Sequence, residues 1–356
     1  MTDDAHSTID QGTWVAWFGA VVMVAGFVGG GIVYVANSRV VDPAPLVAVI
    51  APAATTMVVA PLEVGAAGER TVDPYVGYGT WVDVFDYDPA YGAPSVSVAD
   101  LADMAELGVR TVYLQAARLD DRTPDGLVDP WLLTDFLLAA HARDLDVVAW
   151  YLPRFGDDDA DLDRLTAIAE FEVLGHRFDG VAVDIEWIGD GIDDETRTTR
   201  LLSLSDRIRA AVGADPLGAI VPPPVQMEVI NESFWPGFPW RELGDRYDVW
   251  LPMSYWSFRS DSSGYGDGYA YHVESVRRLR NNVGDPDALV HGIGGIGGLD
   301  GVDDPDETPE PLASLEEIER FVVALDDSDS IGGSIYDWDT LEPAVRQRLA
   351  ALFVPS

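Results

Sequence analysis

The chain has 356 residues, of which 47% are hydrophobic, and its 61 acidic residues outnumber the 22 basic ones to give a net charge of −39. A surface this negative repels phosphate backbones and anionic lipid headgroups, which argues against nucleic acid as a partner. The absence of cysteine excludes disulfides and thiolate metal sites.

The N-terminal part predicts a membrane segment. After a tail of residues 1–12, residues 13–36 are almost wholly apolar and uncharged, which is long enough to cross a bilayer. We favour a transmembrane anchor, and a signal peptide cleaved near residues 36–38 is the alternative. Arg39 follows the span and no Lys or Arg precedes it, so the positive-inside rule points the domain inward. Export is nevertheless the usual purpose of such a segment ahead of a soluble domain, so we expect an extracytoplasmic domain, membrane-anchored or secreted.

Residues 37–74 are rich in Ala, Val and Pro and predict a linker, and residues 75–356 predict a single catalytic-type domain. Eight apolar runs in this domain have the length and composition of strands: 81–87, 111–115, 147–152, 180–186, 217–221, 249–255, 289–293 and 333–338. Helical patterns occupy 98–107, 131–143, 162–171, 195–212, 271–282, 315–325 and 341–352, so only the fifth strand lacks a helix. This alternation predicts an α/β fold of the (β/α)₈ TIM-barrel type.

The fourth predicted strand ends on two carboxylates. Because alternate residues of a strand share a face, Ala182, Asp184 and Glu186 point one way, and the apolar residues between them point the other. A carboxylate pair is costly to bury without a use, and a Glu held near neutrality there can serve as a general acid. The alternative is an ion-paired strand end with a purely structural role.

Aromatic residues are dense in the segments that follow the fifth and sixth strands. If they line one face of the barrel, they form a groove in which sugar rings stack; the alternative is ordinary loop packing. The residues concerned are Phe234, Trp235, Phe238 and Trp240 after the fifth strand, and Trp256, Phe258, Tyr265 and Tyr269 after the sixth.

The segment from Asp179 to Glu186 resembles the fourth-strand signature of glycoside hydrolase family 18, the chitinase-like enzymes, whose pattern is Asp-Gly-x-Asp-x-Asp-x-Glu. The resemblance implies that Glu186 protonates the glycosidic oxygen and that Asp184 orients the acetamido group of the substrate, which acts as the nucleophile. Trp187, directly after the motif, is predicted to contact substrate. Ala182 departs from the pattern, because the family has an Asp there.

Two further strand ends carry weaker resemblances. Met253-Ser254-Tyr255 is similar to the family's Met-x-Tyr-Asp, which implies that Tyr255 holds the acetamido group and that Met253 lies beside it. Trp256 stands in place of the final Asp and is predicted to bind substrate.

The segment from Gly332 to Trp338 resembles the family's Gly-Gly-x-Met-x-Trp, with Asp337 in the position of the Trp and Trp338 one residue later. Asp337 is a candidate catalytic carboxylate that pairs with Glu186 or activates water, and Trp338 is a candidate for substrate binding.

Other signals predict no cofactor and no metal. The string Gly292-x-Gly294-x-x-Gly297 fits a dinucleotide fingerprint but does not run into a helix, so we attribute the glycines at 294, 295, 332 and 333 to tight turns. The five His residues lack metal-ligand spacing, although His291, at a strand end, is a candidate for lining the pocket. The acidic runs 157–163 and 303–310 are interpreted as solvated loops.

Two functions remain from the sequence. The first is a glycoside hydrolase acting on a polysaccharide or envelope glycan, possibly one containing N-acetylhexosamine, with Glu186 as the acid. The second is a catalytically inactive barrel that binds glycans at the cell envelope, which the departures at Ala182 and Trp256 favour. A two-carboxylate retaining glycosidase is disfavoured, because the seventh strand does not end in Glu.

Overall fold

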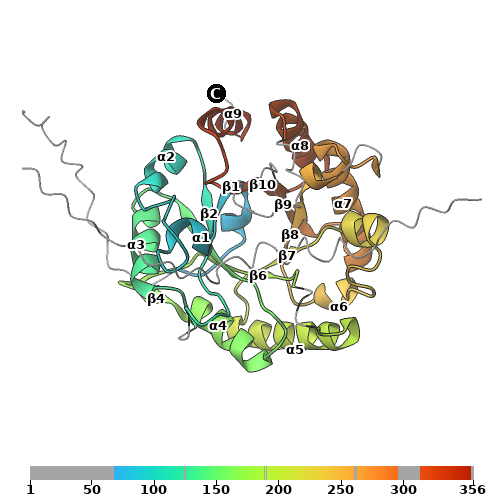
Figure 1. Cartoon of the computed structure of the whole chain (residues 1–356), viewed down its shortest axis with the longest axis horizontal. Helices are drawn as coiled ribbons and strands as arrows, with labels where there is room; N and C mark the ends of the chain where they lie inside the picture. The colour runs from blue at the N-terminus through green and yellow to red at the C-terminus, as the bar shows by residue number, and fades with distance from the viewer. Residues whose placement is uncertain are drawn as a thin grey trace, which may run out of the picture. The chain divides into compact units, whose positions relative to one another are not determined.

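Eight parallel strands close into a barrel in the computed structural model (Figure 1), which describes residues 68–123, 126–187, 189, 191–259, 263–295 and 313–353. The hydrogen-bonded order around the barrel is β1-β10-β9-β8-β7-β6-β3-β2. Their bounds are β1 Gly77–Val82, β2 Thr111–Gln115, β3 Asp146–Tyr151, β6 Gly180–Asp184, β7 Leu217–Val221, β8 Val249–Ser254, β9 Leu289–Gly295 and β10 Gly332–Tyr336. The predicted TIM barrel is confirmed.

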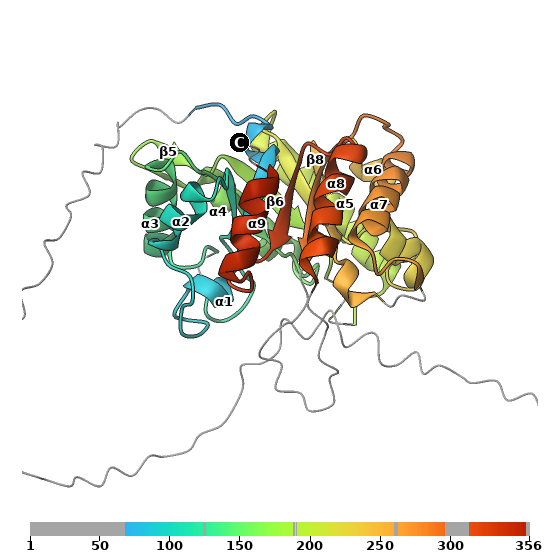
Figure 2. The same ribbon diagram turned by 90° about the horizontal axis from the view of Figure 1, so that it is seen from above.

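Helices surround the barrel on all sides (Figure 1). They are α1 Val84–Tyr87, α2 Asp100–Glu106, α3 Pro130–His141, α4 Asp158–Glu170, α5 Asp194–Val212, α6 Trp240–Leu243, α7 Gly268–Val283, α8 Leu315–Asp327 and α9 Pro343–Phe353. A small antiparallel hairpin, β4 Glu172–Val173 with β5 His176–Arg177, precedes β6. In Figure 2 the short helix α1 and this hairpin lie at opposite ends of the barrel.

Within the described part of the chain, no helix combines the length and apolarity needed to cross a membrane. Residues 13–36, on which the predicted anchor falls, lie outside the described residues.

The first strand differs most from its prediction. It ends at Val82 rather than residue 87, and residues 84–87 form helix α1 instead. The cause is a capping box, in which the Asp83 carboxylate accepts the Phe85 N–H at 2.7 Å and the Asp86 carboxylate accepts the Asp83 N–H at 2.9 Å. The apolar residues of the 84–87 turn concealed this helix start, because they continue the hydrophobic run of the strand.

The acidic run 157–163 is the start of a helix, so its interpretation as a solvated loop is wrong. Asp157 caps α4 through hydrogen bonds from the N–H groups of Asp159 and Ala160. Asp161 is fully buried and accepts a 2.5 Å hydrogen bond from the hydroxyl of Tyr151. Acidic residues are favourable in a first helical turn because the helix dipole is positive there. The second run, 303–310, lies outside the described residues.

Aromatic side chains fill the barrel interior. Tyr75, just before β1, closes the amino end and donates a 2.8 Å hydrogen bond to the carbonyl oxygen of Val181. Above it, the Trp81 ring stacks on Tyr113 with ring centroids 4.4 Å apart. Trp81 also donates through its indole N–H to the Ser334 hydroxyl at 2.8 Å. This packed column is the floor on which the carboxyl end of the barrel is built.

The glycines of β9 and β10 serve strand packing rather than tight turns, so that sequence interpretation is wrong. Gly294, Gly295, Gly332 and Gly333 all lie within strands, and none has a positive φ. A β-carbon at Gly332 would lie 2.6 Å from the carbonyl oxygen of Gly77 and 2.6 Å from Nδ1 of His291. The absence of a side chain therefore lets β10 approach β1 and the buried histidine closely.

Gly332→Ala is expected to destabilise the fold by about 3 kcal/mol, the upper part of the overpacking range, because the clash is with backbone that cannot move aside. Thermal unfolding followed by circular dichroism measures the loss. Gly92→Ala is the matched control, since no atom lies within 4 Å of a β-carbon built there. Equal midpoints for the two variants would contradict the packing role.

Candidate active site at the carboxyl end of the barrel

Asp184 and Glu186 stand at the carboxyl end of β6, on the face that carries Ala182 into the barrel interior. The N–H of Ile185 donates to the carbonyl oxygen of Ile220 at 2.8 Å, so the ladder to β7 extends past Asp184 and the alternation of side chains is kept. Asp184 is buried and Glu186 half-buried. The inward orientation predicted from the sequence is therefore present.

The pKa values of both carboxyl groups are raised, which favours their neutral, protonated forms. Burial raises the pKa of Glu186 to about 7. Burial and, after it, the negative charge of Glu186 raise the pKa of Asp184 well above its usual value. Within the described residues neither carboxylate forms an ion pair, and Oδ1 of Asp184 is buried without a hydrogen-bond partner. The alternative of an ion-paired strand end thus finds no support, and a carboxyl group titrating near neutrality suits general acid chemistry.

Tyr255 interacts electrostatically with carboxylates on both sides of the barrel. It follows β8 directly, above Met253, which is buried in the barrel interior. Burial raises its pKa well above the ordinary value, and the charges of Glu186, Asp184 and Asp337 raise it further. The Tyr255 hydroxyl therefore lies within electrostatic reach of carboxylates from both sides. Gly295 makes room for it, since a β-carbon there would lie 2.8 Å from the Tyr255 ring.

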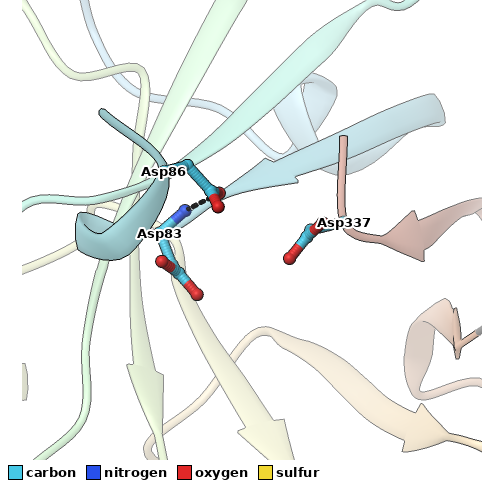
Figure 3. A group of neighbouring side chains, drawn as sticks. All are labelled: Asp83, Asp86 and Asp337. Atoms are coloured by element: carbon cyan, nitrogen blue, oxygen red, sulfur yellow. Dashed lines mark hydrogen bonds between the residues drawn. The ribbon is translucent and has the colours of Figure 1, made fainter. Parts of the chain in front are cut away.

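A second group of carboxylates faces the first across the barrel, because β10 lies four strands from β6 in either direction. Asp337 follows β10, while Asp83 and Asp86 follow the neighbouring β1. The three side chains point toward one another (Figure 3), and one oxygen from each lies within 4.8 Å of the others. All three residues are buried.

Hydrogen bonds satisfy part of this group. The Tyr336 hydroxyl donates to Asp83 at 2.6 Å, and the Thr340 N–H donates to Asp337 at 3.0 Å. Burial and then the charge of Asp83 raise the pKa of Asp337 to about 7, and burial with the charges of Asp83 and Asp337 raises that of Asp86 to about 9. The oxygens have the ligand chemistry of a hard divalent cation. The hydrogen bonds and raised pKa values suit shared protons equally well, since like charges this close cannot all ionise.

Among the aromatic residues predicted to bind substrate, Trp187 lies at the surface of the candidate site. It is half-buried, and the Arg154 guanidinium lies 4.9 Å from the centre of its ring. Cation and aromatic face attract one another, so Arg154 fixes the orientation of the ring beside Glu186.

The other predicted binding aromatics are core residues, which does not fit the proposed contact with substrate. Trp256 is fully buried and stacks on Phe321 of α8. Trp338 is 1% exposed, beneath the guanidinium of Arg346 at 4.0 Å. Trp235 donates through its indole N–H to the Thr198 hydroxyl. All three belong to the layer between the barrel and its helices.

The same holds for the aromatic cluster after the fifth strand, where loop packing is the outcome. Its members are 2–8% exposed: Phe234, Trp235, Phe238 and Trp240. The ring of Phe238 contacts Trp235 edge to face and Trp240 at a tilt. A sugar ring has no access to faces buried in this way.

His291 lies deep in the barrel rather than in the pocket. Nδ1 donates to the carbonyl oxygen of Tyr75 at 2.9 Å, so Nε2 accepts from the Ser334 hydroxyl, also at 2.9 Å. Burial lowers its pKa to about 4, which keeps the ring neutral. Its role is to link the amino end of β1 with β9 and β10.

Sequence reasoning missed Asp83 and Asp86. The available signal was the spacing Asp83-x-x-Asp86 directly after an apolar run, which is a capping box that ends a strand and begins a helix. Because barrel function gathers after strand ends, a capping box there also places carboxylates at the site.

No family model matches the sequence, and no curated protein matches it. Among solved structures, the chain is similar to a chitinase from Rhizomucor miehei, at 14% sequence identity over 78% of this chain and 99% of that one, with a TM-score of 0.51. The two proteins share the eight-stranded parallel barrel fold. A chitinase-like agglutinin from Robinia pseudoacacia is similar at 13% identity over 77% of this chain and 99% of its own, with a TM-score of 0.50.

A glucosidase from Croceicoccus marinus is similar at 11% identity and a TM-score of 0.53, over 78% of this chain and 66% of that one. The chain thus spans about two thirds of the length of that glucosidase. At these identities the likeness concerns the fold, and the resemblance read from the fourth strand is confirmed at that level.

Proposed function

We propose that this barrel is a glycoside hydrolase in which Glu186 is the general acid. The observation that carries the proposal is the pair of Asp184 and Glu186, without an ion pair among the described residues, at the carboxyl end of the strand where chitinase-like barrels place their acid. The raised pKa of Glu186, about 7, leaves it protonated below neutral pH and about half protonated at neutral pH. An acid whose pKa lies near the working pH donates its proton to a leaving oxygen efficiently.

The reaction is substrate-assisted if the glycan contains N-acetylhexosamine. Glu186 transfers its proton to the glycosidic oxygen as the bond from that oxygen to C1 breaks, and the acetamido oxygen of the same sugar attacks C1. A water molecule then attacks C1 and opens the ring that the acetamido oxygen formed with C1. The Glu186 carboxylate takes a proton from this water, which restores the acid. In this proposal Asp184 and Tyr255 orient the acetamido group.

Hydrolysis of a panel of acetamido and non-acetamido oligosaccharides by the full chain tests the substrate class. Turnover limited to acetamido sugars supports the substrate-assisted reaction. Turnover of other sugars instead requires a second carboxylate, for which Asp337, across the barrel, is the candidate.

A catalytically inactive glycan-binding barrel is the second candidate. It is favoured by Ala182, which is buried where chitinase-like enzymes have an inner carboxylate, and by the likeness in fold to a chitinase-like agglutinin. Affinity for glycans without turnover at any pH would establish it over the enzyme.

We propose further that the domain works outside the cytoplasm, tethered or released through residues 13–36. The support is the uncharged apolar length of this segment. Expressed in a bacterial host, the full chain is expected in the membrane fraction and accessible to protease added to spheroplasts. Protease resistance until the cells are lysed would place the domain inside.

A further inference from the structure

A shallow cavity of about 570 Å³, widely open to solvent, lies between the segments that follow β2 and β3. Leu119, Asp120 and Asp121 line it from the first segment, Arg154 from the second, and Arg164 of α4 completes it. Cavities of several hundred Å³ accommodate small organic ligands such as a sugar ring.

Two of the charged residues in this wall are structural. Arg164 donates to three backbone carbonyl oxygens, those of Arg118, Ala160 and Thr123, at 3.0–3.1 Å. Asp120 accepts hydrogen bonds from Arg118 and Arg122. These bonds fix the shape of the wall, so the cavity is preformed rather than opened by a ligand.

The other two charged residues have capacity for a ligand. In the described part of the chain, the side chains of Arg154 and Asp121 take part in no hydrogen bond and no ion pair. One offers a fork of N–H donors and the other a pair of acceptor oxygens. Together with the apolar wall of Leu119, this is the complement of a sugar, whose vicinal hydroxyls both donate and accept. The two Arg and two Asp residues give the lining no net charge, which fits a neutral ring better than an anion.

Arg154 also connects the cavity to the active site. Its guanidinium lies against the ring of Trp187, and Trp187 follows Glu186 directly. A glycan whose cleaved bond lies at Glu186 therefore reaches the cavity by passing over the Trp187–Arg154 pair. The segments after β2 and β3 then determine the direction in which the glycan extends.

We propose that this cavity is a subsite for a neutral hexose unit of the glycan, with Arg154 and Asp121 binding its hydroxyls. The proposal deepens the proposed function and rests on Glu186 marking the cleaved bond. The subsite makes affinity depend on chain length, because short oligosaccharides occupy the active site without reaching the cavity.

The test measures binding of N-acetylglucosamine and glucose (β-1,4) oligomers of two to six units by calorimetry, with the full chain carrying Glu186→Gln. Arg154→Gln and Asp121→Asn are each expected to weaken hexamer binding about tenfold, the effect of losing a hydrogen bond to a charged group. Asp121→Asn, which keeps the Trp187–Arg154 pair, is expected to leave dimer binding unchanged. Arg110→Gln is the matched control, because this half-exposed arginine precedes β2 at the opposite end of the barrel. Circular dichroism verifies folding of every variant.

Equal weakening of dimer and hexamer binding in Asp121→Asn, unchanged hexamer binding in both variants, or no hexamer binding by the parent protein would each overturn the subsite. Loss confined to an oligogalacturonate hexamer in Arg154→Gln would reveal an anion site and overturn it as well. The proposed function fails separately: if no oligomer is hydrolysed by the wild type but the chain-length dependence is lost in the variants, the subsite stands and the enzyme does not.

Discussion

Replacing Glu186 by Gln is expected to reduce turnover of the best oligosaccharide by about 10²–10⁴-fold, the usual contribution of a positioned general acid. Gln keeps the shape of the side chain, so glycan affinity is expected to persist. The pH dependence gives a sharper signature. Since burial raises the pKa of Glu186 to about 7, the acid is protonated below that pH and is lost as pH rises through it, so wild-type turnover falls on the alkaline side. The residual activity of Glu186→Gln is expected to show no such alkaline limb, that is, no fall in turnover as the pH rises through about 7.

Glu172→Gln is the matched control, because this carboxylate is exposed on the β4–β5 hairpin at the other end of the barrel. Its turnover and pH profile should equal those of the wild type. Wild-type turnover in Glu186→Gln would remove Glu186 from the reaction, and an alkaline limb that survives in the variant would assign the titration to another group.

The repeat of apolar runs and helical patterns was sufficient to predict the barrel, because burying each strand under a helix leaves a strong signal in both periodicities. Most strands begin and end within two residues of their predicted bounds. The fourth strand predicted two inward-facing carboxylates for the same reason: alternation puts Asp184 and Glu186 on the inner face once Ala182 is known to face inward.

The other features of the candidate site depend on whether a side chain lies at the barrel mouth or between the barrel and its helices, and the sequence does not record that. An aromatic after a strand has the same pattern whether it stays half-buried beneath an arginine, as Trp187 does, or packs fully buried against a helix, as Trp256 does. The glycines of β10 likewise gave no sign of their partners, since the close approach is to Gly77 and His291, distant in sequence. Asp83 and Asp86 lie near the start of the domain's sequence, and Asp337 lies near its end. The three side chains come together only when β1 pairs with β10 and closes the barrel.

Asp337→Asn is expected to raise the stability of the fold above pH 7 and to flatten its pH dependence. Burial and the charge of Asp83 raise the pKa of Asp337 from 3.8 to about 7, so the folded protein keeps a proton that the unfolded chain releases. Stability from this group is complete below pH 4 and is lost as pH rises to about 7. A shift of this size corresponds to roughly 4 kcal/mol, shared in part with Asp83 and Asp86 because the three groups titrate together.

Urea unfolding from pH 4 to pH 9 measures the effect, and the difference between variant and wild type should grow across the interval from pH 4 to 7. The Asn oxygen still accepts from the Thr340 N–H, so that hydrogen bond is kept. Asp339→Asn removes an exposed charge two residues away and is expected to change stability far less. Parallel curves of stability against pH for Asp337→Asn and wild type would contradict a proton shared within this group.

The turnover of the same variant tests whether Asp337 takes part in the reaction. Unchanged turnover assigns Asp337 to the electrostatics of the barrel mouth, and lost turnover assigns it to the reaction.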